Sequence, residues 1–584
     1  MTVLPSGSEI IINTLLSLNT KNEDSFYNKN VRTFARYGIV FIGSEECYSF
    51  CPFCYINRRP CIFRNPKSHY GHSEKCENCI IFRKYLEQLN SNILSYIADF
   101  LACYNISINA ICSLKFYEIL KNSNPLIRCI KRSDLRAHIY KLFEKFQSEI
   151  TRENLGEFCS ILLDGSTRNL KNYYGFIIFS IKRLFYFKIE KLENSTSLDI
   201  SLATREIINY LHNEINVEVI SVCSDHASNM IKAFNLSDQV SCQIISDSFF
   251  EWVGCCCHLF NLRISDLDSN SIFSEIKNTL HFILSISSKI QLPQKVPSFC
   301  KTRWDSYSKC FNYVLLYSDQ IISYLSSTLN SLFIKNSNLE LKIQRYQKNN
   351  FYLISQQNNL QKEILIYQKS IQLLKSNEFD EITTLFTYMS NLISKIGSDD
   401  FLLYKVYPEI IAMIDFFTTL STENIKKFSD TILNRIFSSD EYIQILTSYF
   451  LTIEGHNYFL NDVNEEERNE FFSIIKNYLI YYNGCKFGDC EEILIQQIEN
   501  FINFENFETF DSYQYWETLR GDQETARLAE IAIRILQMPC SEASVERLFS
   551  HLKYLFGKKN YNLSDDILNA QLGIRLGNIY GKEK

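Results

Sequence analysis

Two short apolar runs in the middle of the chain each lead to an aspartate. Val217–Met230 reads VEVISVCSDHASNM and places Asp225 after a β-branched run, and Ser160–Gly165 reads SILLDG and includes Asp164. Such runs predict buried parallel strands, and ligand sites in open sheets lie at the carboxyl ends of their strands. Two carboxylates at one sheet edge would suit Mg²⁺, and two such ions can hold both oxygens of an in-line phosphoryl displacement. Either aspartate alone could instead cap a turn or a helix.

The length and composition describe a large globular protein. Of its 584 residues, 46% are hydrophobic and 22% are charged, and the scarcity of Gly and Pro favours a largely helical fold. The most apolar stretch, Ile93–Leu114, contains Asp99, Asn105 and Asn109, so it does not predict a membrane span. We find no secretion signal before the 20 cysteines, which indicates reduced thiols and an intracellular protein. Residues 1–150 carry 19 Lys and Arg against 13 Asp and Glu, a basic excess that suits nucleic acid.

Cysteines and histidines cluster between residues 47 and 79. A C-x₂-C pair is followed, 15 residues later, by the segment HYGHSEKCENC, a separation typical of small zinc modules. Thiolate and imidazole together select zinc. The preferred ligands are Cys51, Cys54, His72 and Cys76, with His69 and Cys79 as substitutes. Basic residues beside them could contact phosphates, and free cysteines in a loop-rich segment are the alternative.

Further elements are predicted around the two aspartate-bearing strands. The predicted strands and helices are Tyr173–Ser180, Leu184–Ile189, the helix Ser201–Ile215, the strand Val217–Ser224, the helix Ala227–Phe234 and a fifth strand at Ser241–Ile245. The second and third strands are closely spaced, which favours antiparallel neighbours. The order βββαβαβ is that of an RNase H-like domain, in which metal-binding acids commonly lie on the first and fourth strands.

Near the C-terminus a predicted helix offers a third acid. Ser541 can cap this helix, whose apolar face includes Val545, Leu548 and Phe549, and Glu546 lies at the border of that face. A glutamate there could reach the two aspartates across the sheet, or it could be a solvated helix residue. A following segment, Asn562–Leu576, carries a second apolar stripe.

Two further pairs of residues could support chemistry. Cys255 and His258 are spaced i, i+3 on one helical face and could bind a metal or pack beside a site; the lack of a second ligand pair nearby in sequence favours packing. Trp304 beside Arg303 joins an aromatic plane to a phosphate-binding guanidinium, which suits an unstacked base. A core tryptophan and a surface arginine are the alternative.

Several blocks of the sequence, in the expected order, resemble those of hAT-superfamily DNA transposases. They are FLACYNISINAICSLKFYEILKNSNP (Phe100–Pro125), LLDGSTRNLKNYYG, SDHASNMIKAF, CCCHLFNL (Cys255–Leu262), KTRWDSY (Lys301–Tyr307) and LAEIAIRILQMPCSEASVERLFS (Leu528–Ser550). The cluster of cysteines and histidines similarly resembles a BED-type zinc finger. One departure is Ser166, where family members often carry Trp.

The resemblance implies an α/β RNase H-like catalytic domain that is interrupted by a large α-helical insertion and preceded by a small zinc-finger module. The expected divisions are an N-terminal segment at 1–40, a BED-like finger at 41–85, a helical DNA-binding or oligomerisation subdomain at 86–150, the first part of the core at 151–265, the insertion at 266–527, and the second part of the core with the hAT C-terminal dimerisation region at 528–584. Within the insertion, Asn336–Leu374 could form a long helical hairpin or a partly disordered insert.

The resemblance also implies cut-and-paste transposition. Asp164, Asp225 and Glu546 would hold two Mg²⁺ or Mn²⁺ ions, cut DNA at the element end, close a hairpin on the flanking DNA and join the free 3′ hydroxyl to target DNA. Arg303 and Trp304 would contact distorted DNA, and the Cys–His pair would support the active site. The expected partners are transposon ends, target DNA and another copy of the chain, in the nucleus. A domesticated protein that binds DNA and dimerises without cutting is the main alternative, and an RNase H-like nuclease of another purpose is a third.

Overall fold

The computed structural model of the chain describes most residues after position 76 and two short pieces before it. The described residues are 49–50, 62–63, 77–104, 106–123, 129–168, 171–234, 249–261, 271–299, 304–345, 351–488, 491–504, 511–556 and 564–580. None of the helices in these ranges is long and apolar enough to cross a membrane.

The chain forms two compact units. One comprises Met1–Glu149 together with His551–Lys584, and the other comprises Ile150–Ser550. The finer division into six parts stays a prediction.

In the first unit, the last helix of the chain packs against two helices from near its start. The elements are β1 (Ser49–Phe50), β2 (Ile62–Phe63), α5 (Glu77–Tyr104), α6 (Ile108–Ile111), α7 (Leu114–Ser123), α8 (Arg132–Gln147) and α28 (Asp565–Tyr580). Ile567 and Ile574 of α28 lie in one core with Leu101 of α5 and Ile139 of α8. Arg575 Nη1 donates to the carbonyls of Ala102 and Cys103, at 3.2 and 2.9 Å, and so satisfies the last turn of α5.

A mixed five-stranded sheet forms the centre of the second unit. Its strands are β3 (Phe158–Arg168), β4 (Lys171–Phe179), β5 (Leu184–Leu192), β6 (Glu218–Ser224) and β7 (Glu251–Gly254). They lie in the order β5-β4-β3-β6-β7. Strand β4 runs antiparallel to both of its neighbours, β3 and β5, and β6 runs parallel to both of its neighbours, β3 and β7. The antiparallel pairing of β4 with β5 confirms the prediction. Together with α10 (Ser197–Tyr210) and α11 (Ser228–Phe234), the strands follow the predicted order βββαβαβ.

The strand predicted at Ser241–Ile245 lies outside the described residues and stays a prediction. Two features of this region were not predicted, and the first is β7, a run of only four residues that opens on a glutamate. Helix α10 begins before Ser201 because Thr196 forms a capping box with Asp199. The Thr196 hydroxyl accepts from the Asp199 amide at 3.2 Å, and the Asp199 carboxylate accepts from the Thr196 amide at 3.3 Å.

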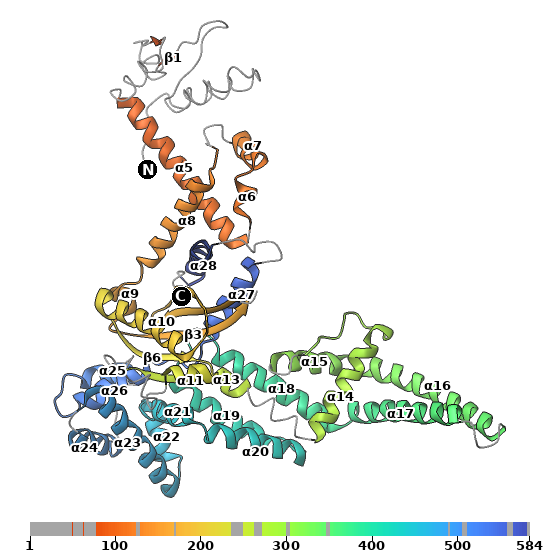
Figure 1. The fold of residues 1–584 in the computed structure, drawn as a ribbon. Helices are drawn as coiled ribbons and strands as arrows, with labels where there is room; N and C mark the ends of the chain where they lie inside the picture. The colour runs from red at the N-terminus through yellow and green to blue at the C-terminus, as the bar shows by residue number, and fades with distance from the viewer. Residues whose placement is uncertain are drawn as a thin grey trace. The chain divides into compact units, whose positions relative to one another are not determined.

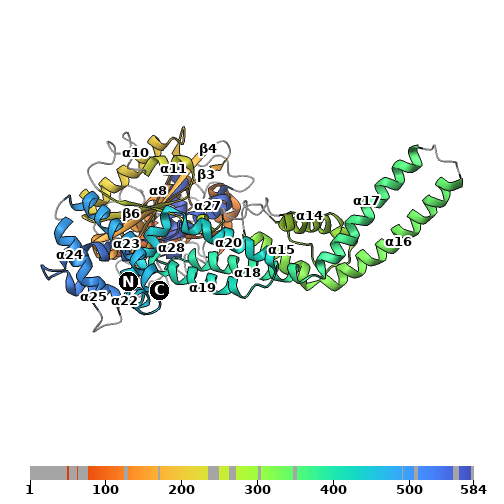
Figure 2. The same ribbon diagram turned by 90° about the horizontal axis from the view of Figure 1, so that it is seen from below.

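Helices make up most of the remainder of the second unit (Figures 1 and 2). They are α9 (Arg152–Leu155), α13 (Cys256–Asn261), α14 (Ser271–Ile286), α15 (Trp304–Leu316), α16 (Ser318–Arg345), α17 (Phe351–Leu374), α18 (Asn377–Ile396), α19 (Val406–Thr418), α20 (Glu423–Phe437), α21 (Asp440–Phe450), α22 (Ile453–Asn461), α23 (Glu465–Phe487), α24 (Glu491–Ile502), α25 (Ser512–Leu519) and α26 (Ala526–Leu536). Helix α27 (Ala543–Phe556) begins here as well. Helices α16 and α17 lie side by side in both views, which favours the helical hairpin of the two alternatives considered for Asn336–Leu374, with its first helix beginning earlier, at Ser318.

The two faces of the sheet pack against different helices. Apolar residues of β3 and β4, including Leu163 and Phe176, share a core with Ile200 of α10 and Met230 of α11. Because side chains alternate along a strand, Gly175 of β4 faces the other way. There it meets α27, and this close approach sets the position of that helix over the sheet.

We predict that Gly175→Ala destabilises the second unit and displaces α27. A Cβ atom at this position would lie 2.9 Å from Val545 Cγ1 and 3.2 Å from Leu548 Cδ2, so the helix would have to shift. Overpacking of this kind costs about 1–3 kcal/mol, which urea denaturation would measure. Gly484→Ala is the matched control, because a Cβ there meets open space in a helix and should raise stability slightly. Equal stability of the Gly175→Ala variant and the native chain would contradict the prediction.

Candidate active site

The two aspartates predicted from the sequence lie at the same edge of the sheet. Strands β3 and β6 are parallel neighbours, and the last pair between them is Leu163 with Ser224. The next residue on each chain segment is an aspartate, so Asp164 and Asp225 lie beside each other. Asp164 also pairs directly with Gly175 on β4. Directly paired residues point to the same face of a sheet, so Asp164 is on the side of the sheet that α27 covers.

Each aspartate accepts one hydrogen bond from a nearby backbone amide. Asp164 Oδ1 accepts from the amide of Gly165 at 2.6 Å, and Asp225 Oδ1 accepts from the amide of Ala227 at 3.2 Å. The second bond shows that the turn-forming role considered for Asp225 does occur, just ahead of α11. Both side chains are half-buried rather than enclosed, so a ligand can approach them.

Helix α27 and the residue directly before it bring two glutamates to this side of the sheet. Glu546 is half-buried, and Glu542, one turn earlier, has a side chain only 1% exposed. The hydroxyl of Ser541 accepts from the amide of Ala543 at 3.0 Å. Because the helix begins at Ala543, Ser541 lies one residue before the position predicted for it as the cap. Val545 fixes the other side of the helix against β4.

The first turn of α27 is also tied to the end of α18. Arg547 forms an ion pair with Asp399, and its Nη1 donates to the carbonyl of Gly397 at 2.9 Å. Ser544 donates to the same Asp399 carboxylate at 2.5 Å. These contacts hold the start of the helix, so the two glutamates have a defined position relative to the sheet.

The four acids repel one another. Burial, followed by the negative charges of Glu542, Asp225 and Glu546, raises the pKa of Asp164 to about 8. Burial likewise raises the pKa of Asp225. A hard divalent cation binds carboxylate oxygens and would offset the repulsion between these acids. The residues present therefore fit Mg²⁺ or Mn²⁺.

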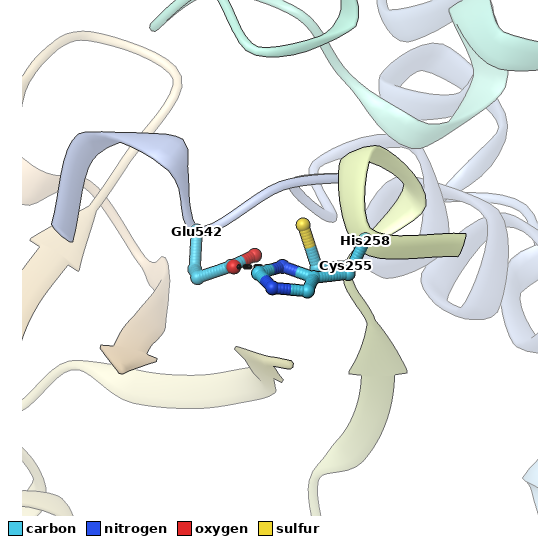
Figure 3. Close-up of side chains that lie close together, drawn as sticks. All are labelled: Cys255, His258 and Glu542. Atoms are coloured by element: carbon cyan, nitrogen blue, oxygen red, sulfur yellow. Dashed lines mark ion pairs between the residues drawn. The ribbon is translucent and has the colours of Figure 1, made fainter. Parts of the chain in front are cut away.

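A tighter cluster of potential metal ligands lies beside the aspartates. Within the described ranges, one group of Cys, His, Asp and Glu side chains has all of its ligand atoms within 4.8 Å of one another: Cys255, His258 and Glu542. Figure 3 shows the three side chains turned toward one another, with His258 Nδ1 at 2.7 Å from Glu542 Oε1. The predicted triad with Glu546 does not form such a close group in this part of the chain.

The structure therefore changes the interpretation of the Cys–His pair. Packing was favoured because no second ligand lies nearby in sequence, whereas Glu542 arrives from nearly 300 residues away. Burial disfavours the His258 imidazolium, but hydrogen bonds with Cys255 and Glu542 outweigh burial and raise the pKa of His258 well above its usual value.

A second long-range contact supports the turn that carries Asp225. His226 Nε2 lies 2.7 Å from Glu441 Oε1 of α21, and the Glu441 side chain is 7% exposed. Burial acts against the Glu441 carboxylate, but the hydrogen bond with His226 prevails and lowers the pKa of Glu441. A Cβ at Gly254 would overlap the ends of both side chains, so a larger residue there would have to displace their contact. No catalytic constellation was predicted in the helical insertion, yet one of its helices holds this turn.

Several predicted site residues cannot be placed. Cys51, Cys54, His69, His72 and Cys76 lie outside the described residues. Cys79 is in α5, and its side chain is outside the described part. The strand pair β1–β2 falls within the predicted finger.

The same holds for the two residues predicted to contact DNA. Arg303 lies outside the described residues, and Trp304 opens α15 with a side chain that the described part does not include. Their roles stay predictions.

Sequence reasoning missed Glu542, Glu441 and His226 as site residues. A signal existed for Glu542, because it precedes Glu546 by four positions and shares its helical face. Glu441 had no comparable signal, since an acid in the first turn of a helix is ordinary.

Comparison with known proteins gives one match. Residues 493–576, which include both Glu542 and Glu546, match the hAT family C-terminal dimerisation region. The match supports hAT-family membership and assembly of the chain into homo-oligomers. A search of curated proteins found no significant match.

Proposed function

We propose that the chain is a DNA transposase of the hAT type, with a catalytic core of the RNase H-like class. The observation that carries the proposal is the placement of Asp164 and Asp225 on neighbouring parallel strands beneath an acid-bearing helix. The strand order β5-β4-β3-β6-β7 and the match over residues 493–576 support it independently.

In this proposal, Asp164, Asp225 and Glu546 hold Mg²⁺ or Mn²⁺. When bound, such ions neutralise charge on a phosphate and lower the pKa of an attacking water. The protein positions the ligands through the pairing of β3 with β6 and through the contact of α27 with Gly175. Before a cation binds, Asp164 holds a proton at neutral pH, because its pKa is raised to about 8, and it gives up this proton when the cation arrives.

The proposed reaction is cleavage and joining of DNA. One phosphodiester is hydrolysed at the element end, and the released hydroxyl attacks the opposite strand, which closes a hairpin on the flanking DNA. The free 3′ hydroxyl then joins target DNA. Trp304 would stack on the distorted strand and Arg303 would bind its phosphate.

The N-terminal region would bind DNA in this scheme. Zinc held by Cys51, Cys54, His72 and Cys76 would order a BED-type finger, and neighbouring basic residues would contact phosphates. Because such a protein acts on chromosomal DNA, we expect it in the nucleus. We expect it to act there as a homodimer or a larger homo-oligomer.

The test is cleavage of a labelled duplex that carries the ends of the source element, with Mg²⁺ or Mn²⁺. We expect nicks and hairpins from the native chain, and a loss of at least about 100-fold in Asp225→Asn and in Glu546→Gln. Glu499→Gln is the control, because this glutamate pairs with Lys476 on the surface and should leave cleavage unchanged.

Two results would decide against the proposal. A native chain that binds the duplex but never cuts it with either metal would indicate the domesticated DNA-binding alternative. Cleavage that shows no preference for the terminal sequence would indicate a general nuclease.

A further inference from the structure

We propose that Cys255, His258 and Glu542 form a second metal site, which takes Zn²⁺ and is separate from the Mg²⁺ or Mn²⁺ site of the aspartates. Their ligand atoms, one thiol sulfur, one imidazole nitrogen and one carboxylate oxygen, all lie within 4.8 Å of one another (Figure 3). The inference stands on this geometry and does not depend on the proposed DNA chemistry.

Backbone hydrogen bonds hold the two segments of the site together. The amide of Cys255 donates to the carbonyl of Ser224 at 2.8 Å, which fixes the cysteine beside the end of β6. The amide of Cys256 donates to the carbonyl of Cys540 at 2.8 Å, two residues before Glu542. Helix α13 then presents His258 one turn after Cys255. The three ligands are thus positioned by main-chain contacts rather than by the ion alone.

Glu542 is the observation that points to a bound cation. Its side chain is 1% exposed, and its Oε1 atom lies 2.7 Å from His258 Nδ1. Its Oε2 atom has no hydrogen-bond partner among the described residues. A buried carboxylate oxygen without a partner is costly, and coordination to a metal is one of the few arrangements that compensates.

The donor set selects the metal. Mg²⁺ and Ca²⁺ prefer oxygen ligands throughout, whereas Zn²⁺ accepts sulfur, nitrogen and oxygen together in a tetrahedron. Two ligands at about 2.0 Å from a tetrahedral ion lie roughly 3.3 Å apart. Binding would therefore lengthen the distance between His258 Nδ1 and Glu542 Oε1, now 2.7 Å, by about half an ångström. Three protein ligands leave the fourth position to water or to a nearby side chain.

Such a site would also affect the aspartates. The carboxylate of Glu542 acts electrostatically on both Asp164 and Asp225. Zinc bound to Glu542 would offset that negative charge without occupying the aspartates.

The test is the zinc content of the full-length chain after dialysis against buffer that contains Mg²⁺. We expect Cys255→Ser and Glu542→Gln each to hold about one zinc ion fewer per chain than the native protein. Cys256→Ser is the matched control, since Cys256 is as deeply buried as its neighbour but lies outside the group, and it should retain the native content. Counting differences between variants also cancels any zinc held near the N-terminus.

Cobalt provides a second readout. Co²⁺ loaded in place of zinc should give a sulfur-to-metal charge-transfer absorption that is weaker in Cys255→Ser than in Cys256→Ser. Urea denaturation with and without zinc shows whether a variant has merely lost packing: zinc should stabilise Cys256→Ser more than Cys255→Ser. Equal zinc content in all variants, or a loss of Mn²⁺ affinity in Glu542→Gln with native zinc content, would overturn the proposal.

Discussion

Replacing Asp164 with Asn is expected to abolish DNA cleavage and, in the absence of metal, to stabilise the folded chain. The carboxylate is held close to Glu542, Asp225 and Glu546, so its ionisation is opposed in the folded state. Asparagine keeps the shape and can still accept from the amide of Gly165, but it carries no charge. Under the proposed function, cleavage should fall by at least about 100-fold, because a proposed ligand of the reaction metal is lost.

The gain in stability should depend on pH. A carboxyl group with a pKa of about 8 when folded and 3.8 when unfolded costs at most roughly 4 kcal/mol at pH 7, and solvent near the half-buried group reduces this to about 2 kcal/mol. Because the folded pKa is the higher one, the folded chain binds the proton more tightly. The native free energy of unfolding should therefore be greatest below about pH 4 and fall as the pH rises toward 8.

Urea denaturation in the presence of a chelator, over the range from about pH 4 to pH 8, would measure this effect. The native chain should lose stability across the range, and Asp164→Asn should lose less. Glu499→Gln should follow the native curve, since that glutamate lies on the surface. Added Mg²⁺ should stabilise the native chain more than Asp164→Asn. A variant that is less stable than the native chain at neutral pH without metal would contradict the account.

The sequence predicted the centre of the sheet well because each element carries a local signal. The run that became β6 is apolar and β-branched, and β4 and β5 are separated by a short connection. Strand β7 was missed because four residues that begin with a glutamate carry little pattern. That glutamate, Glu251, is buried because Gln444 of α21 donates to it at 2.7 Å.

The candidate site was only partly predictable for the same reason. Asp164 lies within a recognisable strand and Asp225 directly after another, and their proximity follows from parallel pairing. The roles of Glu542 and Glu441 depend on contacts with His258 and His226 across more than 200 residues. No periodicity within a helix specifies which distant side chain will cover it, so burial of these two acids required the folded structure.

Arg534→Met is expected to destabilise the second unit by about 3 kcal/mol or more. The guanidinium of Arg534, in α26, is 6% exposed and contacts Glu218 at 2.8 Å and Glu530 at 2.8 Å. It also lies over the ring of Phe158, 4.4 Å from the centroid. Methionine would retain much of the packing but would leave the half-buried Glu218 with only Lys486 as a cationic partner among the described residues.

The position of the ion pairs that Arg534 forms with Glu218 and Glu530 explains why their loss should affect the candidate active site. Phe158 and Glu218 open the two parallel strands β3 and β6, and Asp164 lies within β3 while Asp225 directly follows β6. Helix α26 precedes the segment that carries Glu542 and Glu546. Loss of these contacts would therefore disturb both parts of the site.

Urea denaturation should show that adding Glu218→Gln to Arg534→Met restores part of the lost stability, because the incompletely paired negative charge of Glu218 is removed. Lys427→Met, which breaks an exposed pair with Glu423, should cost less than about 0.5 kcal/mol. If Arg534→Met costs no more than this control, the ion pairs of Arg534 do not hold the strands in place.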